Sequence, residues 1–348
     1  MPRHGPFRVL DIAAQAGLSE ATVDRVLHDR PGASVRATRA VHTAIAELER
    51  QAGQVRLGGV TLVLDLVIQA PERFSTQVRV ALERELPALR PATMRARTHT
   101  SEVADAAAVV EVLDRIARRP QAAGGVILKA PDDPAVGAAV DGLAERGIPV
   151  VTLVTDVRAC RRVAYAGPDN PAAGATAASL VHGYVAGAPG VVLATVSRSV
   201  FVGERERLDG FLAELARLEP DREVVVLADA DGLDEGVAGA VRAALEHRAD
   251  VVGVYSIGGG NRAIVAELDA AGVRPRIHVG HDLDEDNLGL LRSGRLDIAL
   301  HHDLRADVRW AARQVLRHHR ALPGAPTTRA APVEVVTRHN IPWRLTQG

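Results

Sequence analysis

Residues 9–27 read VLDIAAQAGLSEATVDRVL, and this stretch decides how the N-terminal part of the chain folds. Ile12 and Ala16 are four residues apart, which places them on one inner face of a short helix. Gly17 follows at the point where a residue in the left-handed conformation ends a helix at little cost. Ser19 is a good N-cap for a second helix, because its hydroxyl can accept a backbone N–H of the first turn. The stretch therefore predicts two short helices around a tight turn.

The second helix presents one apolar and one polar face. Val23, Val26 and Leu27 point inward, and a third helix over residues 34–50 carries a matching apolar stripe. The outward residues are Glu20, Ala21, Thr22 and Arg25. Three short helices with a glycine-centred turn are typical of a helix-turn-helix DNA-binding unit. A small helical bundle without a ligand is the alternative, because residues 1–50 hold seven arginines against six acidic residues and attract phosphate only locally.

Short runs rich in Val, Ile and Leu recur through the rest of the chain. They cover residues 60–68, 125–129, 149–154, 190–196, 223–228, 250–255, 276–280 and 297–301. Amphipathic, Ala-rich stretches between them cover residues 76–89, 104–118, 135–146, 171–187, 204–217, 234–247, 261–271 and 304–320. Continuous apolar runs fit strands covered on both faces, and repeated strand–helix units form parallel sheets. About 290 residues of such units exceed one core, so we expect two α/β lobes.

Composition excludes several classes of protein. The 42 Lys and Arg residues nearly cancel the 43 Asp and Glu residues, so the chain has no global basic field. A single cysteine, Cys160, excludes a disulfide framework and any multi-cysteine metal site. No apolar run is long enough to span a membrane, and Arg8 and Asp11 interrupt the only candidate for a signal-peptide core. We therefore expect a soluble, cytoplasmic protein.

The N-terminal unit resembles the headpiece of the LacI family of transcription regulators. Residues 10–48, LDIAAQAGLSEATVDRVLHDRPGASVRATRAVHTAIAEL, match the spacing of that headpiece without gaps. The resemblance implies that the helix over residues 20–27 enters the major groove of DNA, and it assigns contacts to Ser19, Glu20, Ala21, Thr22 and Arg25. Ser19 and Thr22 take phosphate-side positions, and the other three take base-reading positions. A glutamate can accept from a cytosine amino group, and an arginine can bind guanine through two hydrogen bonds.

Two positions depart from the pattern of that family. Asp24 stands where many relatives have a small hydroxyl side chain, and its carboxylate would repel phosphate unless it pairs with Arg25 or faces the protein. The family also follows its third helix with a hinge helix that wedges a leucine into the minor groove, but no such motif occurs between Leu48 and Val60. Because three glycines lie in residues 51–59, we expect a short linker there.

The remainder of the chain, residues 60–346, resembles the periplasmic-binding-protein-like effector domain of LacI regulators, and its sugar-binding branch in particular. The motifs that carry this resemblance are VVTLVTD (150–156), YAGPDNPAAG (165–174), GERERLDGF (203–211), VYSIGGGNRA (254–263) and VGHDLD (279–284). The resemblance implies a type I two-lobed α/β fold with parallel sheets and a small ligand between the lobes.

Polar side chains follow the predicted strands, where open parallel sheets bind their ligands. They are Asp156, Asp169, Arg205, Asn261, Asp282 and His302. A polyol needs acceptors for paired hydroxyls, donors to its oxygens, and side chains that do both, and this set supplies all three. The resemblance aligns four of them with sugar-binding residues, namely Asp156, Arg205, Asn261 and Asp282, and places His302 where a Gln or Asp often lies. Phe74 or Phe201 would stack on the sugar, and we expect Phe201 to belong to the core.

Each of these residues also has a purely structural interpretation. Asp169 would cap the helix that begins at Pro171, and Arg205 would form a solvated ion pair with Glu206. Asn261 would cap its own helix, and Asp282 would cap a helix over residues 285–293. The pair of histidines at 301–302 lacks a third ligand at metal spacing, so we expect no metal site.

We expect three ranges: a DNA-binding domain (1–52), a linker (53–58) and a two-lobed effector domain (59–348). Lobe 1 is expected over 59–188 and 296–322, and lobe 2 over 189–295 and 323–348. The predicted function is a transcription regulator, a repressor acting as a homodimer on operator DNA, controlled by a small sugar or polyol, without catalytic residues or a cofactor. One alternative is the sugar-binding component of a transporter. The other is an NAD-dependent enzyme, because residues 258–263 satisfy G-x-G-x-x-A and Asp282 lies about 20 residues on.

Overall fold

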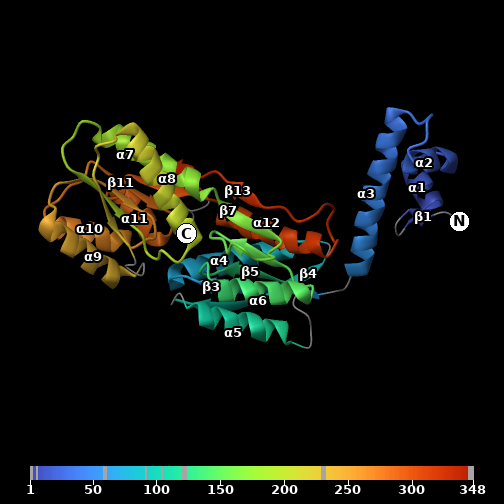
Figure 1. Ribbon diagram of the computed structural model, residues 1–348, viewed down its shortest axis with the longest axis horizontal. Helices are drawn as coiled ribbons and strands as arrows, with labels where there is room; N and C mark the ends of the chain where they lie inside the picture. The colour runs from blue at the N-terminus through green and yellow to red at the C-terminus, as the bar shows by residue number, and fades with distance from the viewer. Residues whose placement is uncertain are drawn as a thin grey trace.

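The computed structural model describes residues 3–4, 7–57, 61–90, 92–102, 105–119, 124–228 and 233–343. A small helical headpiece lies at one end, and two α/β lobes form the rest of the molecule (Figure 1). Among the described residues, none of the helices has both the length and the apolar character that crossing a bilayer requires.

The headpiece consists of three helices: α1 (Val9–Ala16), α2 (Glu20–Leu27) and α3 (Val35–Leu57). A short antiparallel pair, β1 (Arg3–His4) and β2 (Phe7–Arg8), precedes them. Gly17 ends α1 with a φ of 65°, and the Ser19 side chain accepts the backbone N–H of Thr22 at the start of α2. Ile12, Val23 and Val41, one from each helix, are fully buried together. The predicted helix-turn-helix is therefore present.

The third helix is longer than predicted. We expected it to end at residue 50 and a linker to follow, but α3 continues to Leu57. The segment QAGQVRL contains one glycine, Gly53, among residues that favour helix. One internal glycine costs only about 1 kcal/mol relative to alanine, which a long helix tolerates. Helix α3 therefore passes through most of the expected linker.

Lobe 1 is a six-stranded, entirely parallel sheet with helices on both faces. Its strand order is β13-β7-β6-β5-β3-β4. The strands are β3 (Thr61–Gln69), β4 (Thr93–Ser101), β5 (Gly125–Lys129), β6 (Val150–Leu153), β7 (Ala164–Pro168) and β13 (Arg329–Ala331). Helices α4 (Glu72–Glu85), followed by the 3-10 turn η1 (Leu86–Ala88), and α12 (Leu304–His318) share one hydrophobic cluster. Helices α5 (Ala106–Ala117) and α6 (Pro134–Glu145) share the cluster on the opposite face.

Lobe 2 repeats this architecture. Its strand order is β14-β12-β11-β10-β8-β9, in which only β14 is antiparallel to its neighbour. The strands are β8 (Val191–Thr195), β9 (Val224–Leu227), β10 (Val251–Ser256), β11 (Ile277–His281), β12 (Ile298–His301) and β14 (Glu334–Val336). Helices α7 (Asn170–Val185) and α8 (Val202–Leu218) cover one face. Helices α9 (Asp234–His247), α10 (Asn261–Ala270) and α11 (Glu285–Ser293) complete the lobe.

The chain crosses between the lobes at three places, and these differ from the expected boundaries. The first crossing follows β7 rather than residue 188, because α7 packs its buried Ala177 and Val181 against lobe 2. The second follows β12, which pairs with β11 in lobe 2, whereas we had assigned all of 296–322 to lobe 1. The third separates β13 from β14, so that the segment 323–348, expected in lobe 2, contributes a strand to each lobe. Which sheet a strand joins depends on long-range pairing.

All eight predicted strands are present, and among the described residues of the two lobes four further strands are missed. β4 alternates polar and apolar residues at a sheet edge, so it lacks a continuous apolar run. β7 lies within a motif that we interpreted for its polar residues, and β13 and β14 have only three residues each.

Helices α7 and α8 approach each other closely because glycines face the contact. A Cβ at Gly174 would overlap the carbonyl oxygen of Arg207, and one at Gly210 would overlap that of Pro171. Only a residue without a side chain fits at these positions, so the two helices are held at short range.

We predict that Gly174→Ala destabilises the protein by about 1–3 kcal/mol, because the methyl group must push the backbone of α8 away. Gly183→Ala, in the same helix but with open space around it, is the matched control and is expected to be neutral or slightly stabilising. Urea denaturation measures both. Equal effects of the two substitutions would contradict the close packing.

Candidate DNA-reading helix and ligand cleft

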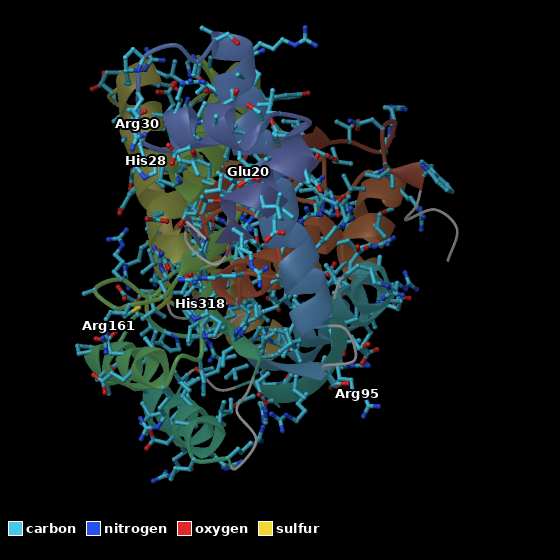
Figure 2. The ribbon with its side chains drawn as sticks, turned by 90° about the vertical axis from the view of Figure 1, so that its right-hand side faces the viewer. Glu20, His28, Arg30, Arg95, Arg161 and His318 are labelled. Carbon is cyan, nitrogen blue, oxygen red and sulfur yellow. The ribbon has the colours of Figure 1, made fainter. Side chains whose placement is uncertain are left out.

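Helix α2 exposes the residues that we expected to face DNA. Glu20, Ala21 and Arg25 are exposed, whereas Val23 and Val26 are buried. The Arg25 side chain makes no hydrogen bond or ion pair with the described residues. The Ser19 and Thr22 hydroxyls lie 2.9 Å apart at the start of the helix. Figure 2 shows Glu20 on the end of the molecule that carries the headpiece.

Asp24 pairs with Arg30 and His28 rather than with Arg25. Its carboxylate accepts from Arg30 at 2.9 Å and lies 3.1 Å from Nδ1 of His28 (Figure 2 labels both partners). These residues follow α2, so the acidic charge is held beside the helix end by basic groups. Arg25 remains available on the reading face.

A cleft lies between the lobes, at the carboxyl ends of strands from both sheets. Lobe 1 contributes Arg73 and Phe74 after β3, Lys129 at the end of β5 and Thr155 after β6. Lobe 2 contributes side chains after β8, β10 and β11, including Ser197, Phe201, Glu204, Arg207, Asn261, Asp282 and Asp284. This is the place where parallel α/β sheets bind ligands. The expected position of the site and the observed cleft therefore coincide.

Asp282 is the most strongly positioned acid of the cleft. It adopts a left-handed φ of 67°, and its Oδ1 lies 3.3 Å from Nε2 of His302. The other ring nitrogen of His302 lies 2.6 Å from Asp307 of α12 in lobe 1. Burial disfavours ionisation of Asp282, but the hydrogen bond and charge of His302 prevail and lower the pKa of Asp282. His302 thus joins an acid of lobe 2 to an acid of lobe 1.

The charge of His302 follows from the same arrangement. Burial lowers the pKa of an imidazole, but the hydrogen bonds with Asp282 and Asp307 outweigh it and raise the pKa of His302 to about 9. His302 itself lies behind Asp282, and the residues that line the cleft do not include it. Its position is that of a support for Asp282.

Asn261 lines the cleft at the start of α10, but its side chain is bound within the protein. It donates to Asn287 at 2.8 Å and lies 3.1 Å from Nε2 of His278. The N-cap of α10 is Gly260, with a φ of 75°, so Asn261 does not cap its helix. A Cβ at Gly260 would collide with Val237, which explains the glycine without any nucleotide.

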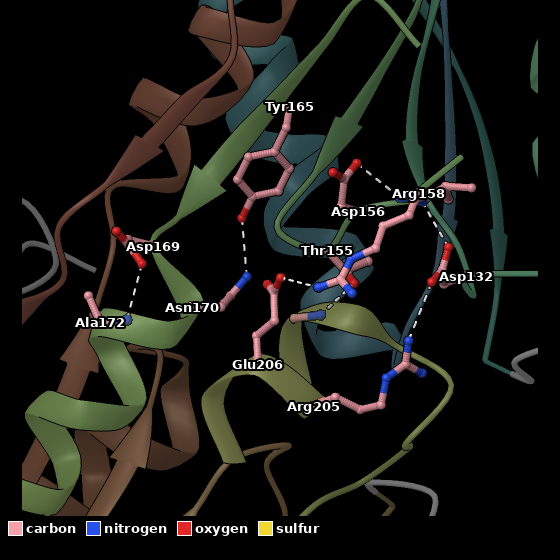
Figure 3. Close-up of polar contacts among 12 residues, drawn as sticks. Asp132, Thr155, Asp156, Arg158, Tyr165, Asp169, Asn170, Ala172, Arg205 and Glu206 are labelled. Atoms are coloured by element: carbon pink, nitrogen blue, oxygen red, sulfur yellow. Dashed lines mark hydrogen bonds and ion pairs between the residues drawn. The ribbon is translucent and has the colours of Figure 1, made fainter. Parts of the chain in front are cut away.

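Three further predicted residues do not line the cleft. Asp156 binds Arg162 and the hydroxyl of Thr152. Asp169 caps α7 by accepting from Ala172 (Figure 3). Arg205 donates to the carbonyl of Ser199 and pairs with Asp132 rather than with Glu206. Of the predicted residues, Phe74, Asn261 and Asp282 line the cleft.

Sequence reasoning missed Arg207, two residues beyond the arginine that it selected. Arg207 is 5% exposed and donates to Oδ1 of Asn170 at 2.8 Å. It stands four residues before Phe211 and eight before Leu215, both buried, so it shares their inward face. Helical periodicity within α8 is the signal that distinguishes it from Arg205.

Lys129 was also missed, and Phe201 had been assigned to the core rather than to the cleft. Phe201 is buried, as expected, but it lies against the cleft, and Nζ of Lys129 is 3.8 Å from its ring centroid. The centroid of the Phe74 ring lies 5.7 Å from the same ammonium group. Burial lowers the pKa of Lys129 to about 8. Two aromatic rings, one from each lobe, thus lie near one buried cation.

Ion pairs join the lobes on two sides of the cleft. Figure 3 shows Arg158 of lobe 1 paired with Glu206 of α8 at 2.5 Å. On the other side, Arg73 of α4 lies 3.5 Å from Asp284 and 3.8 Å from Asp234, both in lobe 2. These contacts would change if the lobes moved apart.

Comparisons with known proteins agree with this two-part organisation, which is that of a regulator with a helix-turn-helix and a two-lobed ligand domain. Residues 9–50 match the family described as bacterial regulatory proteins, lacI family, and residues 67–321 match the periplasmic binding protein domain. Over most of its length the chain belongs to the periplasmic binding protein domain family, and its N-terminal domain is that of the lacI family, a combination that matches a LacI-family regulator. No curated protein matches it.

Solved structures of sugar-binding proteins share the fold of the two lobes. One is a solute-binding protein from Burkholderia graminis in complex with D-arabinose, with 18% identity, a TM-score of 0.74, and coverage of 80% of this chain and 96% of that one. Another is GanP, a glucose-galactose binding protein from Geobacillus stearothermophilus, with 16% identity, a TM-score of 0.72, and coverage of 81% and 99%. At these identities the likeness shows the fold alone.

We predict that His302→Gln lowers the free energy of unfolding by about 2–3 kcal/mol at pH 6, since it removes a buried cation between two carboxylates. The pKa of His302 is raised in the folded state, so its stabilisation is complete below pH 6.5 and is lost as the pH rises through about 9. Urea denaturation at pH 6 and at pH 9.5 measures the difference. His247→Gln, at an exposed site, is the control. A loss that is the same at both pH values would refute the charged interaction.

Proposed function

We propose that this protein is a cytoplasmic transcription repressor that binds operator DNA as a homodimer and responds to a small sugar or polyol bound between its lobes. The observation that carries the proposal is the presence, in one chain, of an exposed reading helix and a polar cleft at the carboxyl ends of two parallel sheets. The match of residues 9–50 to the lacI family supports the DNA-binding part.

In this proposal α2 lies in the major groove of the operator. Glu20, Ala21 and Arg25 face the base edges, since they are the exposed residues of its outer face. The hydroxyls of Ser19 and Thr22, at the N-terminus of the helix, contact phosphate. Pairing of Asp24 with Arg30 and His28 reduces the repulsion that its carboxylate would exert on the DNA backbone.

The effector is held by groups from both lobes. Asp282, kept ionised by His302, is suited to accept hydrogen bonds from hydroxyl groups, and Phe74 offers a ring face for stacking. Asp156, Asp169, Arg205 and His302, which we expected to bind the effector, are proposed to act in supporting structure only. Asn261 is proposed to shape the cleft wall, because His278 and Asn287 already use its amide.

Coupling between the two sites is proposed to run through the relative position of the lobes. Three segments of chain connect them, and Asp282–His302–Asp307 spans one of these connections. Helix α3 leads from the headpiece toward lobe 1 (Figure 1). In a dimer, a rotation of the lobes would change the separation of the two headpieces, and an effector can drive it only by its difference in affinity for the two states.

The sugar-binding component of a transporter remains the second candidate, because the solved structures that share the fold include such proteins. Recovery of genomic DNA fragments by the purified full chain at two salt concentrations distinguishes the two. A regulator enriches a two-fold symmetric site, and the enrichment weakens as salt rises. Recovery at background level, with and without candidate sugars, would favour the transport alternative.

We predict that Arg25→Ala weakens binding to the enriched site by about 1–3 kcal/mol, because one bidentate base contact is lost. Gel-shift or anisotropy titrations at fixed salt measure the change. Arg292→Ala, which removes an exposed arginine of α11 in lobe 2, controls for net charge. An unchanged affinity of Arg25→Ala would remove this residue from the contact set.

We predict that Asp282→Asn abolishes the response to effector while operator binding survives, because the variant loses a charged acceptor in the cleft and leaves the headpiece intact. Operator affinity with and without effector provides the measurement. A variant that still responds normally would mean that the effector binds elsewhere. Asp250→Asn serves as the control. Asp250 is exposed, directly precedes β10 and pairs with Arg248.

A further inference from the structure

Lys129 is the only lysine in the chain, since the other 41 of its 42 Lys and Arg residues are arginine. This single lysine is 9% exposed and lies in the cleft, at the end of the central strand β5. Arginine is the cation that this protein uses on its surface and in its ion pairs. A compact ammonium group at this one position therefore has a particular use.

The ammonium group has donors to spare. Nζ of Lys129 donates to the carbonyl oxygen of Gln69 at 3.1 Å, which uses one of three N–H groups. Its other neighbours are the rings of Phe201 and Phe74, at 3.8 and 5.7 Å from their centroids. In the part of the chain that the structure describes, no carboxylate lies within 4.0 Å of Nζ. A buried charge in that state is costly unless another group compensates it.

Arg207, in the other lobe, is likewise a buried cation whose partners are neutral. Its hydrogen bonds go to neutral acceptors, Oδ1 of Asn170 at 2.8 Å and the carbonyl of Ile257 at 3.4 Å. Within the described ranges it too has no carboxylate at ion-pair distance. Burial is the main cause of the lowered pKa of Lys129; the charge of Glu204 opposes this effect, and the charge of Arg207 adds to it. The cleft thus holds one buried cation from each lobe.

The acids of the cleft are already satisfied by protein groups. Glu204 accepts from the backbone N–H groups of Ser197 and Arg198 and from the Ser197 hydroxyl, at 2.7–3.0 Å. The other four acids have their own donors: Asp282 has His302, Asp284 has Arg73 and the N–H of Asn287, Asp286 has Arg262, and Asp234 has Arg73. Each acid of the cleft thus has a donor from the protein, whereas Lys129 and Arg207 have only neutral acceptors and retain unused N–H groups.

We propose that the effector carries an anionic oxygen group, a carboxylate or a phosphate, which pairs with Lys129 and Arg207. This inference rests on the proposed function and narrows its ligand to an acidic derivative of a sugar or polyol. Hydroxyl groups of such a ligand face Asp282, and its anionic end faces the two cations. Because one cation comes from each lobe, the anion stabilises the arrangement in which the lobes face each other closely.

The single lysine makes a direct test possible. Full-length protein labelled with ¹³C-lysine gives one lysine side-chain signal, whose pH titration reports the pKa of Lys129 alone. The probes are D-glucose, D-gluconate, D-glucose 6-phosphate, acetate and inorganic phosphate. An anion seated beside the ammonium group is expected to raise this pKa by about one unit or more from its lowered value. A rise in this pKa with gluconate or acetate indicates a carboxylate ligand. A rise with D-glucose 6-phosphate or inorganic phosphate indicates a phosphate ligand.

Affinity provides the second measurement. We expect Lys129→Met to weaken binding of the effective anionic probe at least about tenfold and Lys129→Arg to retain part of it, while Arg292→Met leaves it unchanged. If glucose binds as well as the anions and the pKa of Lys129 does not move, the anion site is wrong and the proposed effector cleft still stands. If none of the five probes raises that pKa, the anion site is also overturned.

Discussion

Three crossings of the chain between two parallel sheets are the constraint on which the rest of this structure depends. They follow β7, β12 and β13, and they bring the carboxyl ends of both sheets to one cleft. Each sheet buries its own apolar strands between helices, so each lobe is a separate core. Polar side chains that follow the strands of one sheet therefore face those of the other sheet across the cleft. A relative movement of the lobes would change the distances between them.

The partners of the charged groups in the cleft follow from the way in which the two sheets face each other. Donors from the protein already bind the acids, as His302 does for Asp282 and Ser197 does for Glu204. The cations Lys129 and Arg207 receive only neutral partners among the described residues. The proposed anion would pair with one cation from each lobe, and this would couple ligand binding to lobe position.

Local signals predicted the headpiece well. Gly17 ends α1 and Ser19 caps α2 as expected, since both depend on a few neighbouring residues. The partners of Asp24 were not foreseen, because they depend on how far the side chains of Arg30 and His28 reach. The length of α3 was not foreseen, because the helix continues through Gly53, which we had interpreted as part of a linker. Of the residues predicted to bind the effector, Phe74, Asn261 and Asp282 line the cleft. Arg205 was selected in place of Arg207, because a motif indicates that an arginine is present but not which one faces inward.

The sequence by itself determined the class of fold: a helix-turn-helix, then repeated strand–helix units whose apolar runs require two covered parallel sheets. It also determined that strand ends would carry the site. Only the tertiary structure decided which strand belongs to which lobe, that Asp156 and Asp169 serve the protein's own contacts, and that Lys129 lies buried near two aromatic rings. The physical reason is range. Helix ends and strand runs are set by neighbours in sequence, whereas strand pairing, ion pairing and burial depend on residues far apart in the chain.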